Sequence, residues 1–126
     1  MKIEVSIGEV FDKITILEIK KKKITDGKKL ENINYEIENL YDAIRVDGII
    51  IEENLFKSLM EVNERLWEIE DVLREKEKNK CYDEEFIRCA ESDSVLNDER
   101  FLIKNKINVF YNSQIKEHKS YEHLKY

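Results

Sequence analysis

Two stretches of the chain carry an apolar residue at every third or fourth position, which is the spacing of one helix face. One stretch begins near Lys28 and ends at Asp47-Gly48, and the other covers about 53–78. The roughly 25 residues of the second stretch should span about 37 Å at 1.5 Å per residue, which in so short a chain suggests a central strut or the seam of an oligomer. The two stripes consist of Leu30, Ile33, Ile37, Leu40 and Ile44, and of Leu55, Leu59, Val62, Leu66, Ile69 and Leu73.

A further helix is predicted from Ser6 to about Ile24. Ser6 and Glu9 have the spacing of a capping box, in which the serine oxygen accepts a backbone N–H and the glutamate reaches back. Val5 and Val10 have the spacing of a hydrophobic staple. The helix is expected to stop at Thr25-Asp26-Gly27, because Asp and Gly favour a tight turn.

The pattern is less regular in the C-terminal half. Asp83 is expected to cap a short helix that ends near Ala90, and Ser92-Asp93-Ser94 is expected to be a kink or a new N-cap. A last helix is predicted from about Val95 to Ile115. The alternation in residues 2–5 also suits a short strand, for which Ile49–Ile51 is the candidate partner. The predicted fold is an all-α, antiparallel bundle of four to five helices in a single helical domain, 1–126, with a minor β pairing as an alternative near the N-terminus.

Composition agrees with this fold class. The 126 residues include no proline and three glycines, which disfavours a collagen-like or all-β chain. The formal charge of −6 argues against nucleic acid as a partner. The longest apolar run, Ile49–Ile51, is too short to cross a membrane, so no membrane partner is expected. No signal peptide is evident and only two cysteines are present, so a cytoplasmic location is predicted.

The first predicted helix is apolar on two sides. Val10, Phe11, Ile14 and Leu17 form one face, whereas Ile16 and Ile19 lie on the other. A helix of this kind is buried on two sides. A homo-oligomer with this helix near its seam would bury both faces, and the C-terminal tail is the alternative cover.

Several polar residues are flanked by apolar residues three and four positions away, where a core is expected. They pair with one another to set the helix register, or they line a polar pocket between helices. The same stripes also hold Lys20 and Lys106. The main candidates are Lys13, Asn63, Glu70 and Asp98.

Two clusters of charged residues are candidates for binding a ligand. Glu61, Glu64, Glu68 and Asp71 are spaced 3, 4 and 3 apart, and Glu68 and Asp71 form half of a magnesium signature known in helical pyrophosphohydrolases. The partner Glu-Glu-x-x-Glu element is absent, and a solvated helix face explains the same spacing. Lys20–Lys23 with Lys28 and Lys29 could meet an anionic partner or could simply complement a helix dipole.

No metal or cofactor is predicted. Cys81 and Cys89 are eight residues apart and His118 and His123 are five apart, and neither pair has the spacing of a usual zinc site.

The segment Ser6–Lys20, which reads Ser-Ile-Gly-Glu-Val-Phe-Asp-Lys-Ile-Thr-Ile-Leu-Glu-Ile-Lys, resembles the opening of a family of short bacterial and phage proteins of unknown function. Further matches are Asn63 with Leu66–Asp71, Asn97-Asp98 with Arg100 and Ile103-Lys104, and Lys119–Tyr121. The resemblance implies no reaction, and some members lie near glycosyltransferase or sugar-processing genes. The lysine run departs from the family pattern. The resemblance adds Arg100 and Lys104 to the candidates, with Glu9, Asp12 and Asp71 nearby.

Three functions follow as hypotheses. The first is a self-associating protein-interaction module without catalysis. The alternative is a protein or enzyme that binds an anionic small molecule, such as a sugar nucleotide or phosphate, through Lys13, Arg100 and Lys104. The third is a magnesium-dependent nucleotide pyrophosphohydrolase. The predicted ligand-binding set consists of Lys13, Asn63, Glu70, Asp71, Asp98, Arg100 and Lys104.

Overall fold

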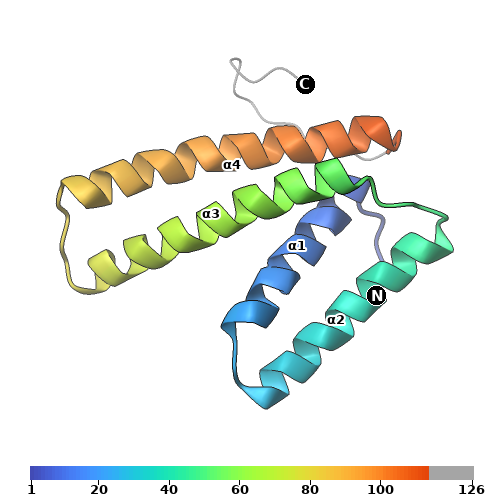
Figure 1. The fold of residues 1–126 in the computed structure, drawn as a ribbon, viewed down its shortest axis with the longest axis horizontal. Coiled ribbons are helices and arrows are strands. Elements are labelled where there is room, and N and C mark those ends of the chain that lie inside the picture. Colours follow the sequence, from blue (N-terminus) through green and yellow to red (C-terminus); the bar gives the residue numbers. More distant parts are fainter. Residues whose placement is uncertain (114–126) are drawn as a thin grey trace.

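The computed structural model describes residues 1–113, and in this range the fold is all-α, as predicted. The helices are α1 (Ile7–Lys23), α2 (Gly27–Val46), α3 (Glu53–Lys78) and α4 (Glu84–Phe110). They form two antiparallel hairpins, α1–α2 and α3–α4, which lie at a marked angle to each other in Figure 1. Within residues 1–113 none of the helices has the length and apolarity needed to cross a bilayer.

The predicted helix starts are confirmed by their caps. The Ser6 hydroxyl accepts the backbone N–H of Glu9 at 3.1 Å, which is the serine half of the capping box. The Glu9 carboxylate accepts from Lys104 at 2.8 Å instead of reaching back to Ser6. Asp26 caps α2 by accepting the N–H groups of Lys28 and Lys29, and Asp83 caps α4 through Phe86. Gly48, with φ of +70°, follows the end of α2, where a left-handed residue terminates a helix.

The C-terminal half differs from the prediction. α4 is one continuous helix, so Ser92–Ser94 is neither a kink nor a new N-cap, and the helix ends at Phe110 rather than Ile115. Asn97 donates to the backbone oxygen of Asp93, but the helix continues through this position. The physical reason is packing, because α4 lies along α3 and this contact outweighs weak capping signals. The last expected residues, 114 and 115, lie outside the described range.

The alternative β pairing is not formed, since residues 2–5 and 49–51 contain no strand. Ile49 and Ile51 pack instead against the core cluster of Phe11, Ile14, Ile44, Leu59 and Ile107. The backbone between them is held by the Tyr111 hydroxyl, which donates to the Ile50 oxygen at 2.6 Å and accepts from the Glu52 nitrogen at 2.7 Å. Side-chain burial and one tyrosine therefore replace the strand ladder.

α1 packs against each of the other three helices, whereas the longer α3 packs against α1 and α4. This position accounts for the two apolar sides of α1, because Phe11, Ile14 and Ile19 are all buried within the single chain. Ile16 is half-buried. The sequence suggested that a second copy or the C-terminal tail covers the two apolar sides of α1. Most of this burial is provided instead by α2, α3 and α4.

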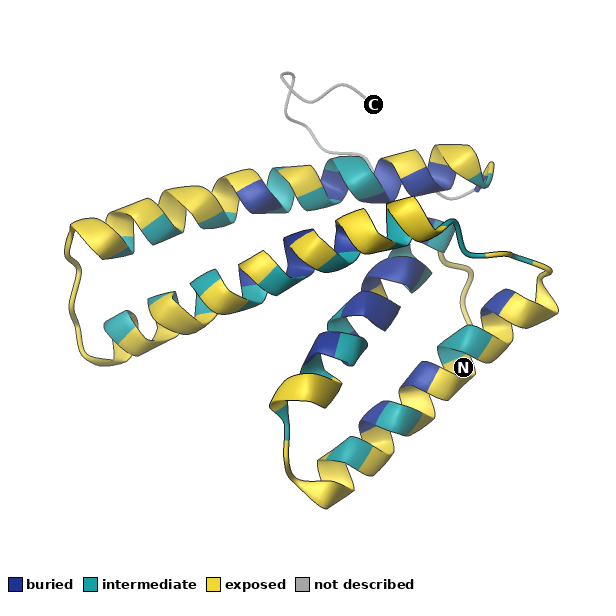
Figure 2. Ribbon diagram, in the orientation of Figure 1, coloured by how far each residue is buried: buried dark blue, intermediate teal, exposed yellow. Residues whose placement is uncertain are grey.

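The α3–α4 hairpin extends beyond its contact with α1 as an arm, which we define as residues 67–95. No residue of the arm is fully buried, whereas buried residues gather on α1 and on the adjacent parts of α3 and α4 (Figure 2). Lys76 holds the far end of the arm through Asp83 at 2.9 Å and Glu85 at 3.0 Å. The arm is a two-helix layer that projects from the core.

Candidate functional site

A buried polar network lies where α1 meets α3 and α4. Its centre is Asp12, which is 1% exposed. Asp12 Oδ1 accepts from Asn63 Nδ2 at 2.9 Å and from Arg100 Nε at 3.0 Å, and Asp12 Oδ2 accepts from Arg100 Nη2 at 2.5 Å. The bidentate Arg100 pair has the planar geometry in which guanidinium and carboxylate groups bind most strongly. One carboxylate therefore joins three helices.

Lys104 adds a second cation, and it is 5% exposed. Its Nζ lies 2.8 Å from Glu9 Oε2 and 3.8 Å from Asp12 Oδ2. Asn63 Nδ2 also donates to Thr15 Oγ1, and that hydroxyl donates to the Asp12 backbone oxygen. Each buried charge of the network thus faces an opposite charge, as burial of ionised groups requires.

The start of α1 is tied closely to α4. Gly8 N donates to Asn108 Oδ1 at 2.7 Å, and Ile7 N donates to Ser113 Oγ at 3.3 Å. A Cβ at position 8 would lie 2.5 Å from the Lys104 carbonyl oxygen, which is closer than real contacts allow. Glycine at position 8 therefore permits the approach that brings Glu9 and Asp12 to their partners.

The structure brings together three of the seven predicted site residues, namely Asn63, Arg100 and Lys104. Lys13 is exposed on α1, and Asp71 is exposed and pairs with Arg74 at 2.6 Å. Asp98 is half-buried on α4. Glu70 is half-buried on α3, and its electrostatic neighbours are Asp93, Arg74 and Arg100.

Glu70 and Asp93 form an acidic pair between α3 and α4. Burial raises the pKa of Glu70, and a hydrogen bond with Asp93 and the charge of Asp93 raise that pKa further. Arg74 and Arg100 act in the opposite direction. One oxygen of Asp93, Oδ1, is buried without another hydrogen-bond partner among the described residues. A protonated Glu70 carboxyl would donate to this oxygen, in keeping with the raised pKa of Glu70.

Sequence reasoning listed Asp12 and Glu9 only as neighbours and missed Thr15, Gly8, Asn108 and Asp93. The candidates were chosen because they are polar residues flanked by apolar residues three and four positions away. Asp12 fails this criterion because Gly8, Glu9 and Thr15 are among the residues three and four positions away. The same criterion pointed to its exposed neighbour Lys13 instead. The signal that was present is the resemblance block Ser6–Lys20, which contains Gly8, Glu9, Asp12 and Thr15.

Carboxylates that the sequence suggested as magnesium ligands lie beside basic side chains instead. Glu64 lies 3.7 Å from Lys22, and Asp71 pairs with Arg74. Within residues 1–113 no three His, Cys, Asp or Glu side chains come together as a metal-binding group. The acidic face of α3 thus contacts the lysine-rich end of α1.

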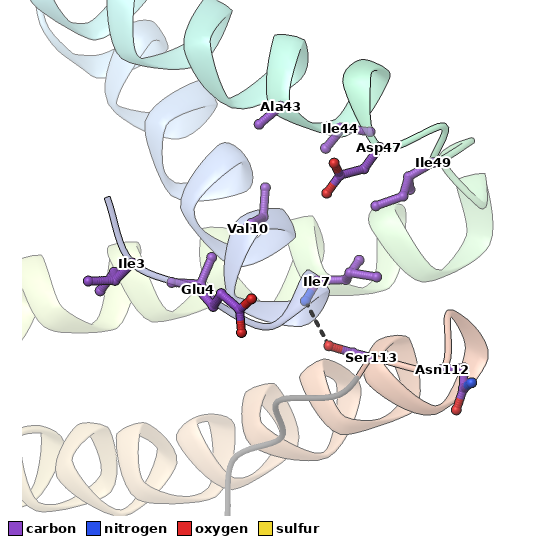
Figure 3. Close-up of a pocket in the computed structure, with 11 residues that line it drawn as sticks. Ile3, Glu4, Ile7, Val10, Ala43, Ile44, Asp47, Ile49, Asn112 and Ser113 are labelled. Carbon is purple, nitrogen blue, oxygen red and sulfur yellow. Dashed lines mark hydrogen bonds between the residues drawn. The ribbon is translucent and has the colours of Figure 1, made fainter. Parts of the chain in front are cut away.

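A pocket of about 500 Å³ lies near the start of α1, away from the network. The N-terminal residues, the start of α1, the end of α2 and the residues that follow α4 line it (Figure 3). Its walls include Ile7, Val10 and Ile44, and Glu4 and Asp47 supply acidic groups. None of the seven predicted site residues lines this pocket.

The model of a family of unknown function (DUF6165) matches residues 1–124. The chain belongs to this family. No curated protein and no solved structure matches the chain. The family covers nearly the entire sequence but carries no assigned reaction. The bacterial or phage origin expected from the resemblance stays a prediction.

Proposed function

We propose that this protein is a non-catalytic interaction module that self-associates through the side of α3 and α4 opposite α1. The observation that carries the proposal is a groove of about 460 Å³, which lies on the arm and on the helical turns of α3 and α4 next to it. Its apolar residues are Ile69, Val95 and Leu96, and its charged residues are Arg65, Glu91 and Glu99. Val95 is 58% exposed.

The groove and the network occupy different sides of the hairpin. Arg65 lines the groove and Asn63 binds Asp12. Two residues along an α-helix correspond to a rotation of about 200°, so the two side chains leave α3 in nearly opposite directions. The network stabilises the junction with α1, and the groove is available to a partner.

A second copy suits the groove by charge. The apolar residues are bordered by both signs, with Arg65 on α3 and Glu91 and Glu99 on α4. Arg65 forms no ion pair among the described residues, so a carboxylate from an identical groove can satisfy it. A surface that carries apolar residues and both charges is self-complementary, as a two-fold interface requires.

The available area also suits a dimer. α3 has 26 residues and is therefore about 39 Å long. Two adjacent helices, each about 10 Å wide, offer a face of roughly 780 Å². A standard stable interface buries about 800 Å² from each partner.

The test is sedimentation equilibrium at micromolar concentration. We expect the wild type to dimerise and Val95→Glu to be monomeric, because a carboxylate would be buried in the apolar centre. The matched control is Val46→Glu at the end of α2, where the valine is 85% exposed and lies outside the groove. A monomeric wild type, or equal loss of the dimer in both variants, would overturn the proposal.

The anionic-ligand hypothesis has less support. Of its three cations, Arg100 already binds Asp12 and Lys104 binds Glu9, while Lys13 is exposed. The pyrophosphohydrolase hypothesis requires carboxylates that instead contact Lys22 and Arg74. We also propose a cytoplasmic location, which the unbridged Cys81 and Cys89 support.

A further inference from the structure

The strongest charge asymmetry in the molecule is at the turn between α1 and α2. Residues 20–29 contain six lysines and one acidic residue, Asp26, in a chain whose net charge is −6. This turn is the free end of the α1–α2 hairpin, at the lower edge of Figure 1. We call residues 20–29 the basic tip.

The fold neutralises the basic tip only in part, where Glu64 and Glu68 of α3 line a small pocket with Lys22 and Lys23. Among its lysines, Lys22 forms the single ion pair found within residues 1–113, at 3.7 Å from Glu64. Lys21, Lys23, Lys28 and Lys29 are exposed. The tip therefore concentrates positive charge on a surface that faces solvent.

Helix dipoles explain only some of the lysines in the basic tip. Lys20–Lys23 occupy the last turn of α1, where cations are favourable. Lys28 and Lys29 occupy the first turn of α2, which contains no acidic residue. Cations are unfavourable at a helix N-terminus, because the dipole is positive there. Asp26 at the N-cap of α2 offsets part of this charge, and the remaining excess of lysines points to an external anion.

We infer that the basic tip docks on a bilayer surface that contains anionic lipid. A lipid surface is flat, so a convex hairpin end can contact it without an extended groove. Each lysine near such a surface strengthens the electrostatic attraction to anionic lipid. Half-buried Ile24 lies between the lysines, but it packs against Leu17, Ile33 and Ile37, so the contact with lipid is electrostatic. The sequence prediction of no membrane partner rested on the lack of a spanning segment, and this contact needs none.

The geometry keeps the acidic groups at the far end of the hairpin away from the lipid, whereas Glu64 and Glu68 of α3 lie beside the α1 side of the tip. α1 has 17 residues and α2 has 20, which makes them about 26 and 30 Å long. The Debye length at physiological ionic strength is about 8 Å. Acidic groups at the far end of the hairpin are therefore screened from a bilayer that touches the tip.

Nucleic acid is a less suitable occupant. Residues 20–29 contain no aromatic side chain on which a base could stack. The basic residues are confined to one hairpin end and do not follow a helix along its length, as a nucleic-acid footprint does.

The test is co-sedimentation of the full chain with vesicles. We expect binding to vesicles of equal parts phosphatidylcholine and phosphatidylglycerol and none to phosphatidylcholine alone. Binding should fall at least about tenfold when Lys21, Lys23, Lys28 and Lys29 are replaced by Gln. High salt should abolish it, because the Debye length shrinks to about 3 Å at 1 M.

The matched control replaces four exposed lysines elsewhere, Lys2, Lys57, Lys78 and Lys106, by Gln, so both variants have the same net charge. This control should bind like the wild type. Equal loss in both variants, no binding of the wild type, or tighter binding to duplex DNA or RNA than to the anionic vesicles would overturn the inference. The test does not depend on self-association, because it concerns a surface outside the arm.

Discussion

Packing against other helices restricts which residue can occupy positions 8 and 12. Gly8 and Asp12 lie on the same side of α1. Position 8 has no space for a Cβ, because the backbone of α4 is in contact. Position 12 holds a carboxylate that binds donors from α3 and α4. Together they align α1 with the α3–α4 hairpin, and a change at either should affect the junction of the two hairpins.

Replacing Gly8 by Ala should destabilise the protein by about 1–3 kcal/mol, because the added methyl group meets a backbone carbonyl that cannot rotate away. Urea unfolding measures the change. Gly27→Ala is the matched control, since a Cβ there meets nothing within 4 Å. It should be neutral or stabilising by up to about 1 kcal/mol. Equal stabilities of the two variants would contradict the close approach of α1 and α4.

Replacing Asp12 by Ala should cost about 3 kcal/mol, because Arg100 and Lys104 would lose the carboxylate between them. Lys13→Ala, at the adjacent exposed position, should change stability by no more than about 0.5 kcal/mol. Thermal or urea unfolding of both variants makes the comparison. A loss in Lys13→Ala as large as in Asp12→Ala would show that the exposed lysine, and not the network, supports the junction.

The helices differ in what stabilises them. α1 is held by apolar contacts and charges on several sides, whereas the arm depends on a thin seam between α3 and α4. The Glu70–Asp93 pair lies in this seam and places two acids against each other. Opposing carboxylates weaken the arm when both are ionised, so its stability should depend on pH.

Glu70→Gln should stabilise the protein at neutral pH. The folded-state pKa of Glu70 is raised, so keeping this group ionised in the folded state costs free energy. That cost appears as the pH rises above the unfolded value of about 4.3 and is complete above the folded-state pKa. The advantage of Glu70→Gln should therefore vanish near pH 4, as urea unfolding across this range will measure. Glu77→Gln, at an exposed position of α3, is the control. An advantage that is independent of pH would contradict this assignment.

At the scale of the molecule, the two angled hairpins leave one large face of α3 and α4 without a packed partner within residues 1–113. If this face is the dimer interface, folding and association are linked by mass action. The melting temperature of the wild type should then rise with protein concentration, while that of Val95→Glu should not. Scanning calorimetry over a range of concentrations measures the slope. A flat wild-type response would count against self-association.

Much of the helical structure could be predicted from the sequence. The bounds 53–78 were predicted as observed, and Ser6, Asp26 and Asp83 lie where helices begin. These signals are local, since apolar spacing and capping involve residues within about four positions. The predicted break at Ser92–Ser94 was wrong, because a local capping signal does not include the stabilisation that α4 gains from packing along α3.

The candidate site was only partly predictable. Asn63, Arg100 and Lys104 were selected. The carboxylate that binds Asn63 and Arg100 belongs to Asp12, which is 88 positions from Arg100 and has a single apolar residue, Ile16, among the positions three and four away. Apolar spacing along one helix contains no information on which residue of a distant helix lies opposite. That pairing is set by how closely α1 approaches α4 at Gly8 and by the angle between the hairpins. Helix positions thus follow from local chemistry, whereas the network and the burial of α1 on both sides follow from contacts between distant segments.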